Sequence, residues 1–187
     1  MRAVMLLLSL SAFLPLGCAA SVNPLASDRI IEFDEELLGT WVDAELSGEA
    51  RTQDQVVILA DGKGYRIEFS DLPEPKVVSA ELVRLGDIRI LDISYAAKPD
   101  DPPHYFVLVS ESHGFLKLAH VDPRKLQKIV KENEPMLSIP KPTDKWPFLQ
   151  IDWSTEQLQA FFARYGESVF VESEYREPLK KLAQGNN

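Results

Sequence analysis

The sequence predicts a mainly β fold, an antiparallel meander that closes into a barrel with two helices packed against it. Seven segments between residues 39 and 121 have the composition and spacing of strands, and short glycine-containing turns join most of them. Two later segments carry apolar residues at helical spacing behind a capping residue. Because an open meander exposes two strand edges, and about eight strands enclose a small interior, we expect the meander to close.

The N-terminal stretch predicts where the protein is held. Arg2 precedes an apolar run that ends at Gly17 and Cys18, the only cysteine in the 187-residue chain. The run is shorter than the roughly 20 residues that span a membrane. It resembles a bacterial lipoprotein signal, in which the cysteine is diacylated through its thiol and becomes the mature N-terminus. The resemblance implies a signal peptide over residues 1–17, lipidation of Cys18 and a bacterial cell-envelope protein. Ala19 after the cysteine favours the outer membrane, facing the periplasm.

A second interpretation of the same stretch stays open. Small residues at Ala19 and Ala20 also suit ordinary secretory cleavage after either of them, with Cys18 lost or left as an idle thiol. With one cysteine, no internal disulfide can form in either case.

The charge balance argues against several partners. Removal of residues 1–17 takes away one of the 20 Lys and Arg residues and none of the 29 acids, which leaves a formal charge of −10. Such a surface repels nucleic acid and anionic lipid head groups, so both are poor partner candidates. Apolar residues make up 45% of the chain, which is enough for one core. We expect a flexible tether over residues 18–29 and a single domain over residues 30–187.

The strands are expected in chain order after an apolar lead-in. Ile30, Ile31, Phe33, Leu37 and Leu38 are too apolar for a linker and predict a helical turn or a strap packed across one end of the domain. Turns are predicted at residues 61–64, 86–87 and 113–114, where glycine supplies the positive φ. The predicted strands are residues 40–46, 55–60, 65–69, 76–85, 88–95, 105–110 and 115–121.

Two helices follow the strands. Asp122 as N-cap and Pro123 at the first helical position predict a helix over residues 122–134. Residues 135–147 contain four prolines and form an extended crossing. Ser154 and Gln157 form a capping box that begins a helix over residues 154–166, which ends at Gly166. Residues 148–153 and 169–172 are candidates for further strands.

The triplet Gly39-Thr40-Trp41 opens the strand run after an apolar lead-in. It resembles the Gly-x-Trp signature of the lipocalin-like (calycin) barrels. Together with the strand order over residues 39–121, it fits best the small uncharacterised lipoproteins with lipocalin-like domains. The resemblance implies that Gly39 and Trp41 mark one end of the barrel. There, a basic residue from a late strand covers the tryptophan, and Arg164 and Arg176 are the candidates. It implies no defined ligand.

No pattern for catalysis or cofactor binding stands out. If His113 and Gly114 form a two-residue turn, Val107 pairs with His120, and His104 then points to the opposite face, so the histidines share no metal. No Gly-x-Ser-x-Gly elbow is present, and Gly62 and Gly64 fit a hairpin better than a phosphate loop. We therefore expect no enzyme, cofactor or metal. The acid pairs, which suit surface positions, are Glu35-Glu36, Asp100-Asp101 and Glu172/Glu174.

The aromatic residues leave two functions open. A roomy barrel would use its inward aromatics to line a pocket for a small apolar ligand, whereas a filled barrel would use them as core. The candidate ligand-binding residues are Tyr65, Phe69, Tyr95 and Tyr105. The leading hypothesis is a non-enzymatic, lipid-anchored ligand-binding protein, and the alternative is a protein-interaction module of an envelope assembly or an inhibitor. The apolar stripe of the second helix, expected to dock on the sheet or to bind a partner, is Leu158, Phe161, Phe162 and Tyr165.

Overall fold

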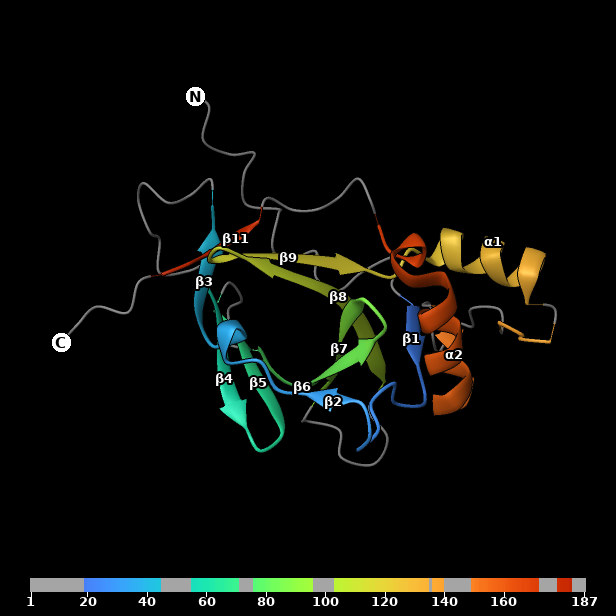
Figure 1. Cartoon of the computed structure of the whole chain (residues 1–187), viewed down its shortest axis with the longest axis horizontal. Helices are drawn as coiled ribbons and strands as arrows, with labels where there is room; N and C mark the ends of the chain where they lie inside the picture. Colours follow the sequence, from blue (N-terminus) through green and yellow to red (C-terminus); the bar gives the residue numbers. More distant parts are fainter. Residues whose placement is uncertain are drawn as a thin grey trace, which may run out of the picture.

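The computed structural model of the chain describes residues 19–44, 55–70, 76–95, 103–134, 136–139, 149–171 and 178–182. The fold is mainly β, an eight-stranded antiparallel barrel with two helices and short strands outside it (Figure 1). This confirms the predicted fold class. Among the described residues, no helix has the length and apolarity that a membrane crossing requires.

The barrel follows the chain almost in order. Each strand from β3 to β9 pairs antiparallel with the next, and β11 pairs antiparallel with both β9 and β3. The short β11 therefore closes the barrel and leaves no free edge in the ring. The barrel strands are β3 (Gly39–Asp43), β4 (Gln55–Asp61), β5 (Gly64–Phe69), β6 (Lys76–Leu85), β7 (Ile88–Ser94), β8 (His104–Ser112), β9 (Phe115–His120) and β11 (Leu179–Lys181).

The two ends of the barrel differ in how their strands are joined. The tight hairpins predicted at residues 61–64, 86–87 and 113–114 lie at one end, together with Gly39 and Lys181, and we call it the strap end. The β8–β9 pairing places Val107 opposite His120, as predicted from the turn. At the other end, the loop end, the connections are residues 45–54, 71–75 and 96–102, which lie outside the described residues.

The lead-in predicted as a strap crosses the strap end. β2 (Ile31–Glu32) pairs antiparallel with the part of β6 that extends beyond its pairing with β5. A 3₁₀ turn, η2 (Glu35–Leu37), follows and places the Leu37 side chain in the barrel core at 1% exposure. We call residues 31–38 the strap.

The eighth barrel strand is not the one that the sequence predicted. Residues 166–169 form the 3₁₀ helix η3 (Gly166–Val169), and Phe170 makes only an isolated bridge with Val121. Val169 and Phe170 are almost fully buried in the core outside the barrel, so this apolar pair packs under the helices. The polar sequence of β11 gave no such signal, because it is held by pairing on both edges.

An outer layer covers one side of the barrel wall. The helices α1 (Pro123–Asn133) and α2 (Thr155–Tyr165) lie there with β1 (Ala19–Ser21) and β10 (Leu149–Ile151) (Figure 1). Asp122 caps α1 through the backbone amides of residues 124 and 125, and Ser154 and Gln157 form the predicted capping box. β1 joins the layer to the wall, since it pairs parallel with β10 and antiparallel with β8.

The tether expected over residues 18–29 requires a correction from residue 19 onward. Ala19 and Ala20 are 4% and 3% exposed within β1, and Leu25 is fully buried. The small side chains that suggested flexibility instead allow the segment to fit closely between the barrel wall and the outer strand β10. Cys18 itself lies outside the described residues.

Two apolar cores lie on the two faces of the barrel wall. One fills the barrel around Trp41, Ile58 and Leu82, and the other packs α1, α2 and β1 against the outer face of β6 to β9. Because successive side chains of a strand point to opposite faces, residues such as Leu91 lie inside while Ile90 and Asp92 lie outside.

Candidate functional site

The strap end is closed by a tryptophan, a lysine and the strap. Trp41 is completely buried, and its Nε1–H donates to the carbonyl oxygen of Leu37 at 2.9 Å. Lys181 of β11 lies over its ring, with Nζ 5.2 Å from the centroid, and donates to the carbonyl oxygen of Glu36 at 2.8 Å. A cation over an indole face is attracted by the ring's negative quadrupole. These contacts tie the first and last barrel strands to η2.

Gly39 permits this arrangement. Its φ is +131°, a conformation that side-chain-bearing residues rarely adopt. A Cβ at this position would lie 3.0 Å from Cε of Lys181, so the lysine stem occupies the space of the missing side chain. Glycine at this position therefore leaves room for the lysine side chain that covers Trp41.

The basic residue over the tryptophan is not one of the two expected. Arg164 lies on α2 outside the barrel and pairs with Glu134 at 2.8 Å, whereas Arg176 lies outside the described residues. Lys181 takes the position because β11, and not residues 169–172, is the closing strand. Sequence spacing could not find it without the register of that strand.

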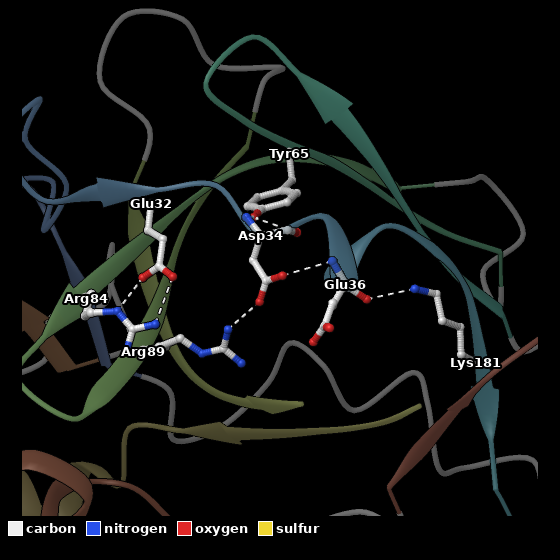
Figure 2. A network of polar contacts seen from close by, with 7 residues as sticks. All are labelled: Glu32, Asp34, Glu36, Tyr65, Arg84, Arg89 and Lys181. Atoms are coloured by element: carbon white, nitrogen blue, oxygen red, sulfur yellow. Dashed lines mark hydrogen bonds and ion pairs between the residues drawn. The ribbon is translucent and has the colours of Figure 1, made fainter. Parts of the chain in front are cut away.

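A polar network fixes the strap over the barrel (Figure 2). The Asp34 amide donates to the Tyr65 hydroxyl at 2.7 Å, and the hydroxyl lies 3.3 Å from the Asp34 carbonyl oxygen. Arg89 pairs with the Asp34 carboxylate, and both side chains are largely buried. Arg84 binds the Glu32 carboxylate through Nε and Nη2, at 2.6 and 2.8 Å. The strap is thus held by β5, β6 and β7.

The network shifts several ionisation equilibria. Burial raises the pKa of Tyr65 above its usual value. The bidentate hydrogen bond with Arg84 lowers the pKa of Glu32. A hydrogen bond with the Glu111 carboxyl raises the pKa of Glu36, one member of the predicted acid pair Glu35-Glu36. The other acid pairs, Asp100-Asp101 and Glu172/Glu174, lie outside the described residues.

The four predicted ligand-binding aromatics separate into two groups. Tyr65 is 1% exposed at the strap end, where its hydroxyl binds the strap and its ring stacks on Phe33 at 5.2 Å. Phe69, Tyr95 and Tyr105 are half-buried on the inner face near the loop end. The Tyr95 and Tyr105 rings meet edge to face, with centroids 5.8 Å apart. Tyr65 therefore belongs to the core, and the other three form the candidate site.

The interior of the barrel is packed differently toward its two ends. The strap-end half of the interior is filled by residues no more than 4% exposed, among them Ile58 and Leu116. Toward the loop end, Ile93 and Leu118 are only partly buried against the same core. The alternation of β9 places His120 on this inner face, opposite Val107. Aromatic and aliphatic surface, with phenol and imidazole groups among it, suits an apolar molecule with a polar group.

The histidines lie on three different surfaces. His104 binds the Asp92 carboxylate outside the barrel through Nδ1 at 2.7 Å, His120 faces the interior, and His113 lies in a turn beside Ser112. Within the described ranges, no group of three His, Cys, Asp or Glu side chains is placed to hold a metal ion.

Asp92 is a buried residue that the sequence analysis missed. It is 4% exposed, and its Oδ2 accepts the amides of Leu25 and Ala26 at 2.7 and 3.0 Å. From the other side, Gln159 of α2 donates to the carbonyl oxygen of Leu25 at 2.9 Å. The N-terminal segment is thus clamped between β7 and α2. An acid within the apolar sequence of β7 was the available signal.

The apolar stripe of α2 is core. Leu158, Phe161 and Phe162 are at most 3% exposed and pack in the outer core, and only Tyr165 is partly exposed. The expectation that the helix docks on the sheet is confirmed, and its apolar face is not presented to a partner.

Comparison with protein-family models, with curated proteins and with solved structures found no match to this chain. What the protein does must therefore be inferred from its own residues.

Proposed function

We propose that this protein is a lipid-anchored, lipocalin-like envelope protein whose barrel holds a small apolar ligand at the loop end without catalysing a reaction. The observation that carries the proposal is the difference between the two halves of the interior. The strap end is filled and hydrogen-bonded, whereas Phe69, Tyr95 and Tyr105 remain half-buried on the inner face near the loop end. A ligand covering these rings would remove apolar surface from water.

Two features support the lipocalin-like assignment. Gly39 and Trp41 open the first barrel strand behind a strap, and Lys181 from the last strand covers the tryptophan. This is the arrangement that the resemblance implied, with a lysine from β11 as the basic residue.

The position of β1 supports lipidation of Cys18 over ordinary secretory cleavage. Cleavage after Ala19 or Ala20 would remove residues of β1 that pair with β10 and are nearly fully buried. Cleavage before Cys18 leaves the strand intact. Replacement of Cys18 by Ser should leave the protein unprocessed or move it to the soluble fraction, which fractionation and mass spectrometry of the N-terminus detect. Wild-type processing and partitioning of this variant would contradict the anchor.

The ligand is tested by native mass spectrometry and by a neutral fluorescent apolar probe, N-phenyl-1-naphthylamine. The protein is the chain from residue 18 onward with Cys18→Ser, purified from its own host. We expect a stoichiometric additional mass and saturable probe binding. Tyr95→Ala combined with Tyr105→Ala should weaken probe binding about tenfold or more, because two apolar ring contacts are lost.

Tyr165→Ala, which removes a partly buried aromatic ring from the core outside the barrel, is the matched control and should bind the probe like the wild type. Equal probe affinity of all three proteins, or a loop-end interior with no cavity of roughly 300 Å³, would contradict the ligand site.

The alternative function, a protein-interaction module, has one observation in its favour. Met136, in the segment predicted as the proline-rich crossing, is the most exposed large hydrophobic residue among those described, at 92%. The buried face of α2 removes one of the surfaces on which that function could rely, the others being the acidic loops and the proline crossing. Crosslinking in the intact envelope, with Met136→Gln as the variant, tests it, and the absence of a Met136-dependent partner would count against it.

A further inference from the structure

The exposed face of α1 is basic although the protein as a whole is acidic. Arg124, Lys128 and Lys131 are all exposed, and their spacing of four and three residues places them on one side of the helix. The opposite side carries the buried Leu126 and Val130. The three cations extend about 10 Å along the helix axis, at 1.5 Å per residue.

These charges are not neutralised within the part of the chain that the structure describes. Every ion pair seen there involves other residues, and Lys125, the fourth basic residue of the helix, donates to the carbonyl oxygen of Phe170 at 2.7 Å. Glu134 is engaged by Arg164 and Tyr165. The one exposed acidic residue within α1 is Glu132, which lies at the edge of the basic face. The face therefore carries a net positive charge.

The surroundings of the face suit a lipid surface. Met136 follows the helix by three residues and is 92% exposed, so an apolar side chain lies beyond the last basic residue. The helix packs in the same outer core as Ala19 of β1, and Figure 1 shows α1, α2 and β1 on one side of the barrel. A lipid anchor on Cys18, directly before β1, would hold that side of the molecule near the membrane.

We propose that the exposed face of α1 binds anionic phospholipid head groups, through Arg124, Lys128 and Lys131. The net charge of −10 argued against such lipids, but charges act locally, because salt screens them beyond about 8 Å at physiological ionic strength. Each Lys or Arg near an anionic bilayer strengthens binding roughly fivefold. The proposal draws its orientation from the proposed anchor, but the basic face stands on its own.

The experiment measures co-sedimentation of the chain from residue 18 onward, with Cys18→Ser, with phospholipid vesicles. All the described elements begin after residue 18, so this form retains them. Vesicles of phosphatidylcholine alone are compared with vesicles of equal parts phosphatidylcholine and phosphatidylglycerol. We expect binding only to the anionic vesicles, with loss of that binding near 1 M salt, where the screening length falls to about 3 Å.

Variants locate the surface. Arg124→Glu, Lys128→Glu and Lys131→Glu combined should lower the affinity at least tenfold, and the corresponding Gln triple provides a gentler version if the first is poorly folded. Lys63→Glu, Arg66→Glu and Lys180→Glu combined make the same change in net charge at exposed sites on the barrel and should bind nearly as the wild type.

No sedimentation with anionic vesicles, or equal loss in both triple variants, overturns the proposal. Binding to an acidic polypeptide without binding to the vesicles also overturns it, in favour of a protein partner. The protein used for co-sedimentation has no anchor. A negative co-sedimentation result therefore says nothing about lipidation of Cys18, and a negative result in the fractionation test of lipidation leaves the co-sedimentation result unchanged.

Discussion

The ammonium group of Lys181 lies 5.2 Å from the centroid of the Trp41 ring, which joins the last barrel strand to the first. β11 has only three residues, so its ladder hydrogen bonds are few. The lysine adds a hydrogen bond to Glu36 and covers a fully buried tryptophan. The Lys181 side chain therefore adds to the strand pairing that closes the barrel.

Replacement of Lys181 by Met keeps the apolar stem but removes the charge and the hydrogen bond. We expect a loss of about 1 to 2 kcal/mol in the free energy of unfolding, from the cation–π contact and the bond to Glu36. Urea unfolding followed by tryptophan fluorescence measures it. Lys180→Met, the neighbouring exposed position of β11, should change stability by less than about 0.5 kcal/mol. Equal effects at the two positions would refute the role of Lys181.

Removal of the Tyr65 hydroxyl should loosen the strap. Tyr65→Phe leaves the amide of Asp34 without its acceptor, at a cost of about 1 kcal/mol. Hydrogen exchange should show faster exchange at the Asp34 amide, while the amides of β7 remain protected. Unchanged exchange at Asp34 would mean that the strap does not depend on this contact.

Asp92 should be among the most sensitive polar positions. Asp92→Asn replaces a buried carboxylate that accepts two backbone amides and contacts His104, so we expect destabilisation by about 2 to 4 kcal/mol. In the Asp92→Asn protein, limited proteolysis should also cleave the N-terminal segment faster than in the wild type. The control is Asp28→Asn, which breaks only an exposed pair with Lys63 and should cost less than about 1 kcal/mol. A stable Asp92→Asn protein would contradict the clamp.

Glu81 should make stability depend on pH. Burial, and secondarily the Asp92 carboxylate opposite it, raise the folded-state pKa of Glu81 above the ordinary 4.5. The folded protein then binds this proton more tightly than the unfolded chain. Its contribution to the free energy of unfolding therefore falls as pH rises from about 4.5 through the raised value. Glu81→Gln should stabilise the protein at neutral pH and have no such effect well below pH 4.5.

Glu156 provides the opposite case for the same measurement. Its pKa is lowered by a backbone hydrogen bond at the start of α2 and by Ser154. Its ionised form favours folding, so Glu156→Gln should destabilise the protein at neutral pH, and the difference should vanish as pH falls below the lowered value. Thermal unfolding of both variants across this range checks the two signs, and the same sign for both would contradict the assignment.

Local signals were sufficient for most elements. Alternation predicted β5, the glycines predicted the three hairpins, and Asp122 and Ser154 predicted the helix starts, because each signal acts within a few residues. Local signals did not predict the strand that closes the barrel. Residues 169–172 are the more strand-like by composition, yet β11 closes the barrel because strands β3 and β9 both offer it free edges.

The candidate site, too, could be predicted only in part from local signals. The aromatics could be placed on strands, but only the closed barrel separates Tyr65, bound to the strap, from Tyr95 and Tyr105 at the loop end. The burial of Leu25, which replaced part of the expected tether, likewise depends on a distant carboxylate on β7.

By itself the sequence determined the fold class, the hairpins, the helix caps and the strap, since hydrophobic period and turn chemistry are local properties of the chain. Only the tertiary structure decided that Lys181 covers Trp41, that Asp92 binds the amides of residues 25 and 26, and that β11 closes the barrel. These relationships join residues far apart in the chain or depend on which face of an element is covered, and packing alone brings them about.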